Sequence, residues 1–150
     1  MIIVTVGTTY FEELIIEVDR LCGEGFIKDD VLSQIGSGNY IPKHMRWTRI
    51  VDNFTELLQS ADLVISAGGA TVFELLAMGK DFIAVPNRHV KDDHQAKMLL
   101  ELESLDYCNC CWVLSNLNNL IKLRPKRKQY PKDPELPKYL WNDLLERISI

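Results

Sequence analysis

Side chains that form hydrogen bonds gather in the segment VPNRHVKDDHQAK, residues 85–97. Asn87, Arg88, His89, Asp93 and His94 all fall within it. This density of donors and acceptors suits a ligand with many hydroxyl groups, such as a sugar, and His94 and Asp93 are candidates for a general base. A solvated loop would have a similar composition, so the segment alone leaves both interpretations open.

A second candidate site is the stretch ISAGGATVFELLAMG, residues 65–79, in which an apolar run meets two glycines and then a helical pattern. Gly68 and Gly69 would let the main chain approach a ligand closely, and the following helix would aim free N–H groups at a diphosphate. The alternative is structural, because Thr71 and Glu74 have the spacing of a capping box. The stretch lacks the G-x-G-x-x-G pattern of a dinucleotide site.

Apolar runs alternate with helical patterns along the first part of the chain. The runs predict strands, because they are short and rich in β-branched residues, and helices are expected between them. This alternation predicts an α/β fold with a doubly wound, mainly parallel, Rossmann-like sheet. Ligands then bind beyond the carboxyl ends of the strands, at the loops 7–10, 66–70 and 86–95. The predicted strands are 2–6, 31–35, 47–51, 63–65, 82–85 and 107–114, and the predicted helices begin near 11, 53, 71, 93 and 116, the second with an Asn53–Glu56 capping box.

We expect three segments: a nucleotide-sugar-binding domain at 1–123, a basic linker at 124–134 and an amphipathic helix at 135–150. The linker is rich in lysine, arginine and proline, and leucines recur every four residues after it, as on one face of a helix. The helix is a candidate docking element for a partner, and packing on its own domain is the alternative.

The composition of the 150 residues, 47% hydrophobic and 25% charged, is that of a globular protein. A net charge of −4 gives no support to nucleic-acid binding. Neither a membrane span nor a signal peptide is recognisable, so a cytoplasmic location is expected. Cys108, Cys110 and Cys111 lack the paired spacing of a zinc site and are expected to be buried strand thiols.

The order of these motifs resembles the C-terminal, donor-binding half of the family 28 glycosyltransferases, one half of a GT-B fold. Gly-Thr-Thr follows the first strand, QIGSGNYIPK and VDNF come next, and ADLVISAGGATVFELLAMGK is followed by VPN and DHQ. The resemblance covers residues 1–113 and is most specific in 62–97. Within the family it is greatest to the soluble catalytic subunits of eukaryotic two-part UDP-N-acetylglucosamine transferases, and more distant to bacterial lipid-intermediate transferases.

The resemblance implies a role for each matching residue. The uracil would meet Val51 and Phe54, and Glu74 would accept hydrogen bonds from the ribose. The main chain of the glycine stretch would face the diphosphate, and the second loop would hold the sugar. The full set of implied donor-binding residues is Gly7, Thr8, Val51, Phe54, Gly68, Gly69, Ala70, Thr71, Glu74, Asn87, His94 and Gln95.

The resemblance also implies an inverting transfer of N-acetylglucosamine from UDP-GlcNAc to GlcNAc-diphosphate-dolichol in N-glycan precursor assembly. The acceptor site and the general base would come from a membrane-anchored partner subunit, which would recruit the chain to the cytosolic face of the endoplasmic reticulum. The UDP-sugar is then a substrate, and neither a cofactor nor a metal is expected, in keeping with the lack of a D-x-D pair. Ser66, Ala70 and Asp93 depart from the usual family pattern.

Three alternatives remain open. A bacterial-type polysaccharide transferase subunit would use another UDP-sugar, such as UDP-glucose, on an undecaprenyl carrier. A non-catalytic nucleotide-binding module would bind UDP even after Glu74→Ala and would show no activity with any partner. An NAD-linked oxidoreductase is disfavoured, because the first turn lacks the dinucleotide fingerprint.

Overall fold

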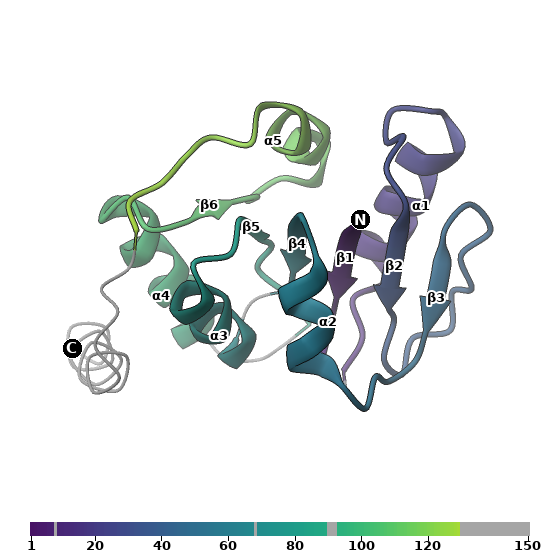
Figure 1. The fold of residues 1–150 in the computed structure, drawn as a ribbon, viewed down its shortest axis with the longest axis horizontal. Helices are drawn as coiled ribbons and strands as arrows, with labels where there is room; N and C mark the ends of the chain where they lie inside the picture. Colours follow the sequence, from purple (N-terminus) through teal and green to yellow (C-terminus); the bar gives the residue numbers. More distant parts are fainter. Residues whose placement is uncertain (8, 68, 90–92, 130–150) are drawn as a thin grey trace.

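The computed structural model describes residues 1–7, 9–67, 69–89 and 93–129. Within them, a parallel sheet of six strands has the order β3-β2-β1-β4-β5-β6, which runs across the molecule in Figure 1. This order confirms the predicted α/β, doubly wound, Rossmann-like fold. The strands are β1 (Ile2–Thr5), β2 (Val31–Gln34), β3 (Arg46–Thr48), β4 (Leu63–Ser66), β5 (Phe82–Ala84) and β6 (Asn109–Cys110).

Helices cover both faces of the sheet. Alternate residues of β1 show why its run carries apolar side chains on both faces: Ile2 and Val4 join one core cluster and Ile3 joins the other, because successive side chains of a strand point to opposite faces. The helices α1 and α5 supply Leu14 and Leu117 to the first cluster, and α2, α3 and α4 pack into the second. Their bounds are α1 (Glu12–Gly23), α2 (Phe54–Ser60), α3 (Ala70–Met78), α4 (Asp93–Ser104) and α5 (Leu117–Leu123), with a 3-10 turn at Leu114–Asn116.

The last predicted strand is much shorter than its apolar run. Only Asn109–Cys110 pair with β5, although the pattern predicted a strand over 107–114. The Cys111 amide still donates to the Ala84 carbonyl at 2.8 Å, but Trp112 and Val113 then turn outward and are exposed. Cys108, Cys110 and Cys111 are buried free thiols, as predicted, but only Cys110 lies within the strand.

The described part of the basic run, 124–129, packs beside the amino end of β6. Asn109 Nδ2 donates to the Pro125 carbonyl at 2.8 Å, and Arg127 binds both Asn109 and Asp106. Figure 1 shows this segment passing from α5 over β6 toward the end of α4. The predicted helix at 135–150 and the rest of the linker lie outside the described residues.

Candidate functional site

The loops after β1, β4 and β5 lie side by side, because these strands are neighbours in the sheet. Hydrogen bonds beyond the strand ends keep the loops in register: the Ala67 amide donates to the Thr5 carbonyl at 3.0 Å, and the Val85 amide donates to the Ser66 carbonyl at 2.7 Å. The three predicted ligand loops therefore form one carboxyl-edge surface. Thr8 and Gly68, which belong to it by prediction, lie outside the described residues.

The turn between β4 and α3 ends in Gly69, which has a φ of 94° and is the N-cap of α3. The capping box predicted from Thr71 and Glu74 is wrong, because the helix begins one residue earlier and no side chain caps it. The Val72 amide donates to the Gly69 carbonyl at 3.1 Å. The amides of Ala70 and Thr71 belong to the first turn, where N–H groups have no acceptor within the helix. Such a terminus is suited to an anion.

A capping box is also wrong at the start of α2, where the Asn53 side chain makes no cap hydrogen bond. Both patterns have the correct spacing but not the backbone geometry that a capping side chain requires. Helix capping therefore does not explain why Glu56 and Glu74 are acidic.

Gln95, Asn87 and Gly69 meet at the centre of this surface. The Gln95 Oε1 atom accepts the Asn87 amide at 3.4 Å. Its Nε2 atom lies so close to Gly69 that a Cβ on Gly69 would be 3.2 Å away. The structure thus brings together residues from two of the predicted loops. Asn87 is buried, and its side-chain amide is hydrogen-bonded within the protein.

The loop after β1 rests on a buried polar pair. Thr5 Oγ1 donates to Gln34 Oε1 at 2.9 Å and accepts the Gly7 amide at 3.2 Å. The loop after β2 supports the same turn, because the Ser37 amide donates to the Thr9 carbonyl at 3.1 Å. Thr5 and Gln34 are almost completely buried. Gly7 is therefore held in one position at the carboxyl edge, as a site for phosphate groups requires.

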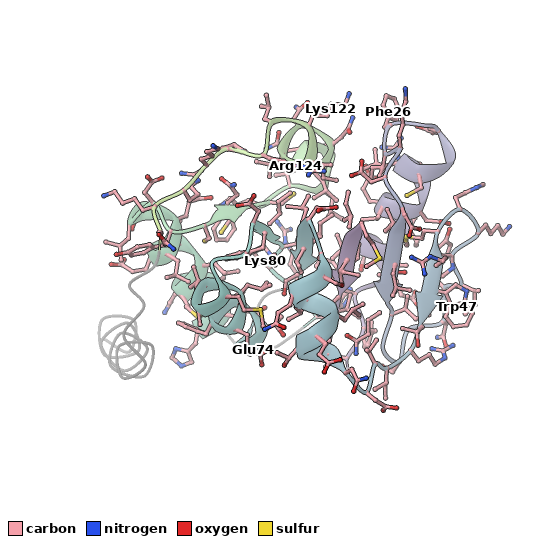
Figure 2. All side chains as sticks on the ribbon, viewed as in Figure 1. Phe26, Trp47, Glu74, Lys80, Lys122 and Arg124 are labelled. Carbon is pink, nitrogen blue, oxygen red and sulfur yellow. The ribbon has the colours of Figure 1, made fainter. Side chains whose placement is uncertain are left out.

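The remaining predicted donor-site residues lie on the α2–α3 side. Val51 and Phe54 are half-buried before and at the start of α2, and Phe54 packs against the cluster that contains Val72 of α3. Glu74 is exposed on α3. Figure 2 shows it on the opposite side of the molecule from Lys122 and Arg124. This placement gives Glu74 a free approach to solvent on the face that carries α2 and α3.

The two candidate general bases stand at the start of α4. His94 is exposed, and Asp93 is the first residue of the helix. The placement of the Asp93 side chain lies outside what the structure describes. Their catalytic role stays a prediction.

A cluster of Tyr10, Glu13 and His89 fastens the loop after β1 to the loop after β5. His89 Nε2 lies 2.8 Å from both carboxylate oxygens of Glu13, and this hydrogen bond lowers the pKa of Glu13. The Tyr10 and His89 rings are 5.0 Å apart. Beside them lies a groove of about 370 Å³ lined in part by Phe11 and Trp112. Sequence reasoning missed Tyr10 and Glu13, because contacts between residues so far apart leave no local pattern.

Two kinds of feature are absent from the described part of the chain. It contains no group of three His, Cys, Asp or Glu residues arranged to hold a metal ion. None of its helices has the length and apolar character that spanning a bilayer requires.

Residues 1–122 match the family model of the glycosyltransferase family 28 C-terminal domain. Because this match spans most of the chain, the chain belongs to that family. Solved glycosyltransferases of low identity cover 95–99% of this chain but only 37–44% of their own length. The fold is thus that of one half of a GT-B glycosyltransferase.

Particular relatives are more informative than the family as a whole. The chain is 37% identical over 124 residues to the UDP-N-acetylglucosamine transferase subunit ALG13 of Mus musculus. The aligned region covers 71% of this chain but only 10% of the mouse protein. It is also 33% identical over 93 residues to a UDP-N-acetylglucosamine–N-acetylmuramyl-(pentapeptide) pyrophosphoryl-undecaprenol N-acetylglucosamine transferase of Prochlorococcus marinus, covering 61% and 23% of the two chains. The NMR solution structure of ALG13 has a TM-score of 0.63 at 19% identity and covers 99% and 96% of the two chains.

Proposed function

We propose that this chain is the donor-binding subunit of an inverting transferase that moves N-acetylglucosamine from UDP-GlcNAc to a lipid-diphosphate-linked sugar, GlcNAc-diphosphate-dolichol. The observation that carries the proposal is the carboxyl-edge surface, where the start of α3, Gly69 and the Gln95 amide converge. Family membership supports the reaction class, and the name of the mouse relative supports the donor.

The diphosphate of the donor is the group that the start of α3 is suited to bind. During transfer the bond between the anomeric carbon and the phosphate oxygen breaks, and negative charge accumulates on the leaving UDP. The amides of Ala70 and Thr71 and the positive end of the α3 dipole would stabilise that charge without reorganising. Gly7 and Thr8 would approach the phosphates from the neighbouring loop.

The rest of the donor would extend along the same edge. The uracil would contact Val51 and Phe54, Glu74 would accept hydrogen bonds from the ribose hydroxyls, and His94 and Gln95 would hold the sugar. The acceptor hydroxyl would attack the anomeric carbon from the face opposite UDP, and its proton would pass to a general base. His94 and Asp93 are the candidates in this chain, and a base supplied by the partner is the alternative.

We propose that an acceptor-binding unit completes the enzyme, since the matched glycosyltransferases contain this donor-binding unit as less than half of their chains. We propose a membrane-anchored subunit that binds the lipid acceptor and recruits this chain to the cytosolic face of the endoplasmic reticulum. The expected second candidate, transfer of a different sugar such as glucose, remains within the same reaction class. It differs in the UDP-sugar that binds and in the lipid carrier of the acceptor, which would be undecaprenyl.

We expect Glu74→Ala to weaken UDP-GlcNAc binding about tenfold or more, because a carboxylate that accepts ribose hydroxyls makes charge-assisted hydrogen bonds. Since Glu74 is exposed, the thermal midpoint should stay close to that of the wild type. Titration calorimetry of the full chain with UDP-GlcNAc, UDP-glucose and NAD measures the affinities.

Glu24→Ala is the matched control, since Glu24 is an exposed carboxylate at the far end of α1, paired with Arg20. Its donor affinity should equal that of the wild type. Unchanged UDP-GlcNAc affinity in Glu74→Ala would contradict the ribose contact and favour a non-catalytic nucleotide-binding module. Binding of NAD in preference to both UDP-sugars would contradict the proposed donor class.

A further inference from the structure

The Asn87 side chain is buried where the loops after β1 and β5 meet, with only 6% of the residue exposed. Its Nδ2 atom donates to the Tyr10 carbonyl at 3.0 Å, and its Oδ1 atom accepts the His89 amide at 3.1 Å. The Asn87 side-chain amide therefore joins the loop after β5 to the loop after β1 and also fixes the turn that follows β5. A buried amide used at both ends is costly to replace, because each lost partner leaves a polar group without its hydrogen bond.

The main chain of Asn87 continues this connection toward the donor site. Its amide donates to Gln95 Oε1 at 3.4 Å, and the other end of the Gln95 amide lies against Gly69. The path from Tyr10 through Asn87 and Gln95 to Gly69 thus joins the three carboxyl-edge loops. Gly69 leaves room for Gln95, since a Cβ there would be 3.2 Å from Nε2.

We propose that Asn87 is a positioning residue of the donor site, which sets the orientation of the Gln95 amide without touching the donor itself. The side-chain bonds of Asn87 fix the conformation of the turn, and that turn aims the Asn87 amide at Gln95. Asn87 is suited to this work because it offers a donor and an acceptor in one rigid plane. The inference rests on the proposed function, and it replaces the expectation that Asn87 lies against the sugar hydroxyls.

A contact between Glu13 and His89 reinforces the same junction. The hydrogen bond between Glu13 and His89 and the tilted contact between the Tyr10 and His89 rings hold the two loops together on the exposed side, while Asn87 holds them on the buried side. The loop after β5 is therefore fastened at two points before α4 begins. A substitution of Asn87 would therefore affect UDP-GlcNAc binding through the orientation of the Gln95 amide.

A double-mutant cycle on the full chain tests the proposal. Asn87→Ala and Gln95→Ala should each weaken UDP-GlcNAc binding about tenfold, the effect of about one lost hydrogen bond. The double variant should bind no more weakly than Gln95→Ala alone, because Asn87 acts through Gln95. Losses that multiply in the double variant would show that Asn87 affects the donor independently, and would overturn the proposal.

Asn109→Ala is the matched control. Asn109 is equally buried, with 6% of the residue exposed. Its side-chain amide is also hydrogen-bonded at both ends, to the Pro125 carbonyl and to Arg127 Nε, but it lies at the amino edge of the sheet. Its donor affinity should equal that of the wild type even where its unfolding midpoint falls. An equal loss of affinity in Asn109→Ala would assign the effect of Asn87→Ala to general destabilisation. If Asn87→Ala does not fold, Asn87→Ser, which keeps a hydroxyl in the buried position, takes its place in the cycle.

The side-chain NH₂ signals of Gln95 in NMR spectra give a readout that does not depend on the donor. They should shift in Asn87→Ala and stay in place in Asn109→Ala. Unmoved Gln95 signals in Asn87→Ala would overturn the positioning role even if the protein binds UDP-GlcNAc. A wild-type chain that does not bind any UDP-sugar would contradict the proposed function, while the NMR comparison still decides whether Asn87 orients Gln95.

Discussion

Gly36→Ala is expected to lower the free energy of unfolding by about 3 kcal/mol or more, in the range of the most damaging single substitutions. Gly36 has a φ of 61°, a left-handed conformation that costs any other residue energy. A Cβ at this position would also overlap the Thr9 carbonyl oxygen and press on that of Gly7. The methyl group therefore cannot be accommodated without separating the loops after β1 and β2.

Neither loop is free to move away. The Ser37 amide donates to the Thr9 carbonyl at 3.1 Å, and the Gly36 amide donates to the Arg49 carbonyl at 3.2 Å. Arg49 Nη1 also donates to the carbonyls of Gly36 and Gly38, at 3.1 and 2.8 Å. Relief of the overlap would break several of these hydrogen bonds at once. Because the Gly7 turn belongs to the proposed diphosphate site, the folded fraction of Gly36→Ala should also bind UDP-GlcNAc more weakly.

Gly25→Ala separates the two causes of this loss. Gly25 has a φ of 81°, but a Cβ there would meet no atom within 4 Å. It should lose only the conformational part, about 1 to 2 kcal/mol. Urea unfolding of both variants measures the difference. Equal losses in the two variants would mean that the loops after β1 and β2 separate readily, and that their contact does not position Gly7.

The fold was predictable to a large extent because burial on both faces leaves a clear mark on a strand. The runs at β1 and β4 carry apolar residues on both faces, which favours a parallel sheet over an antiparallel one. Strand ends were less predictable. Apolar residues continue past β6 as Trp112 and Val113, which are exposed, so hydrophobicity alone could not show where pairing stops.

The candidate site was predictable where function depends on a local pattern. Gly69 and Gln95 were selected from motifs, and the structure brings them together. The role of Asn87 was not predictable, because its partner Tyr10 lies 77 residues away in the sequence. The capping boxes failed for the opposite reason: a short pattern fitted two helices whose starting residues are set by the preceding turns.

The buried carboxylate of Asp19 in α1 was not singled out by any sequence pattern. Its substitution should nevertheless strongly lower the free energy of unfolding. Asp19 is 1% exposed and accepts hydrogen bonds from Tyr40 Oη at 2.6 Å, the Lys43 amide at 3.1 Å and the His44 amide at 2.7 Å. It thereby organises the segment between β2 and β3. Asp19→Asn should lower the free energy of unfolding by about 2 to 3 kcal/mol at pH 7, because hydrogen bonds to a charged group are lost and an NH₂ group faces the donors.

The pH dependence of this loss identifies the carboxylate charge as its source. Burial alone would raise the pKa of Asp19, but hydrogen bonds from Tyr40 and from the Lys43 and His44 amides outweigh it and hold the pKa below its usual value of 3.8. The ionised group therefore contributes stability above about pH 4, and this contribution is lost as the pH falls through the lower pKa of the folded state. The gap between wild type and Asp19→Asn should stay constant from pH 7 to about pH 4 and narrow below it.

Asp30→Asn is the matched control, because Asp30 is an exposed carboxylate paired with Arg46. Exposed ion pairs contribute about 1 kcal/mol or less, so its loss should be small at every pH. Urea unfolding at pH 7, 5 and 3 measures all three proteins. A gap for Asp19→Asn that is as wide at pH 3 as at pH 7 would contradict a stabilising charge, and would leave only the shape of the side chain to explain why the segment between β2 and β3 is ordered.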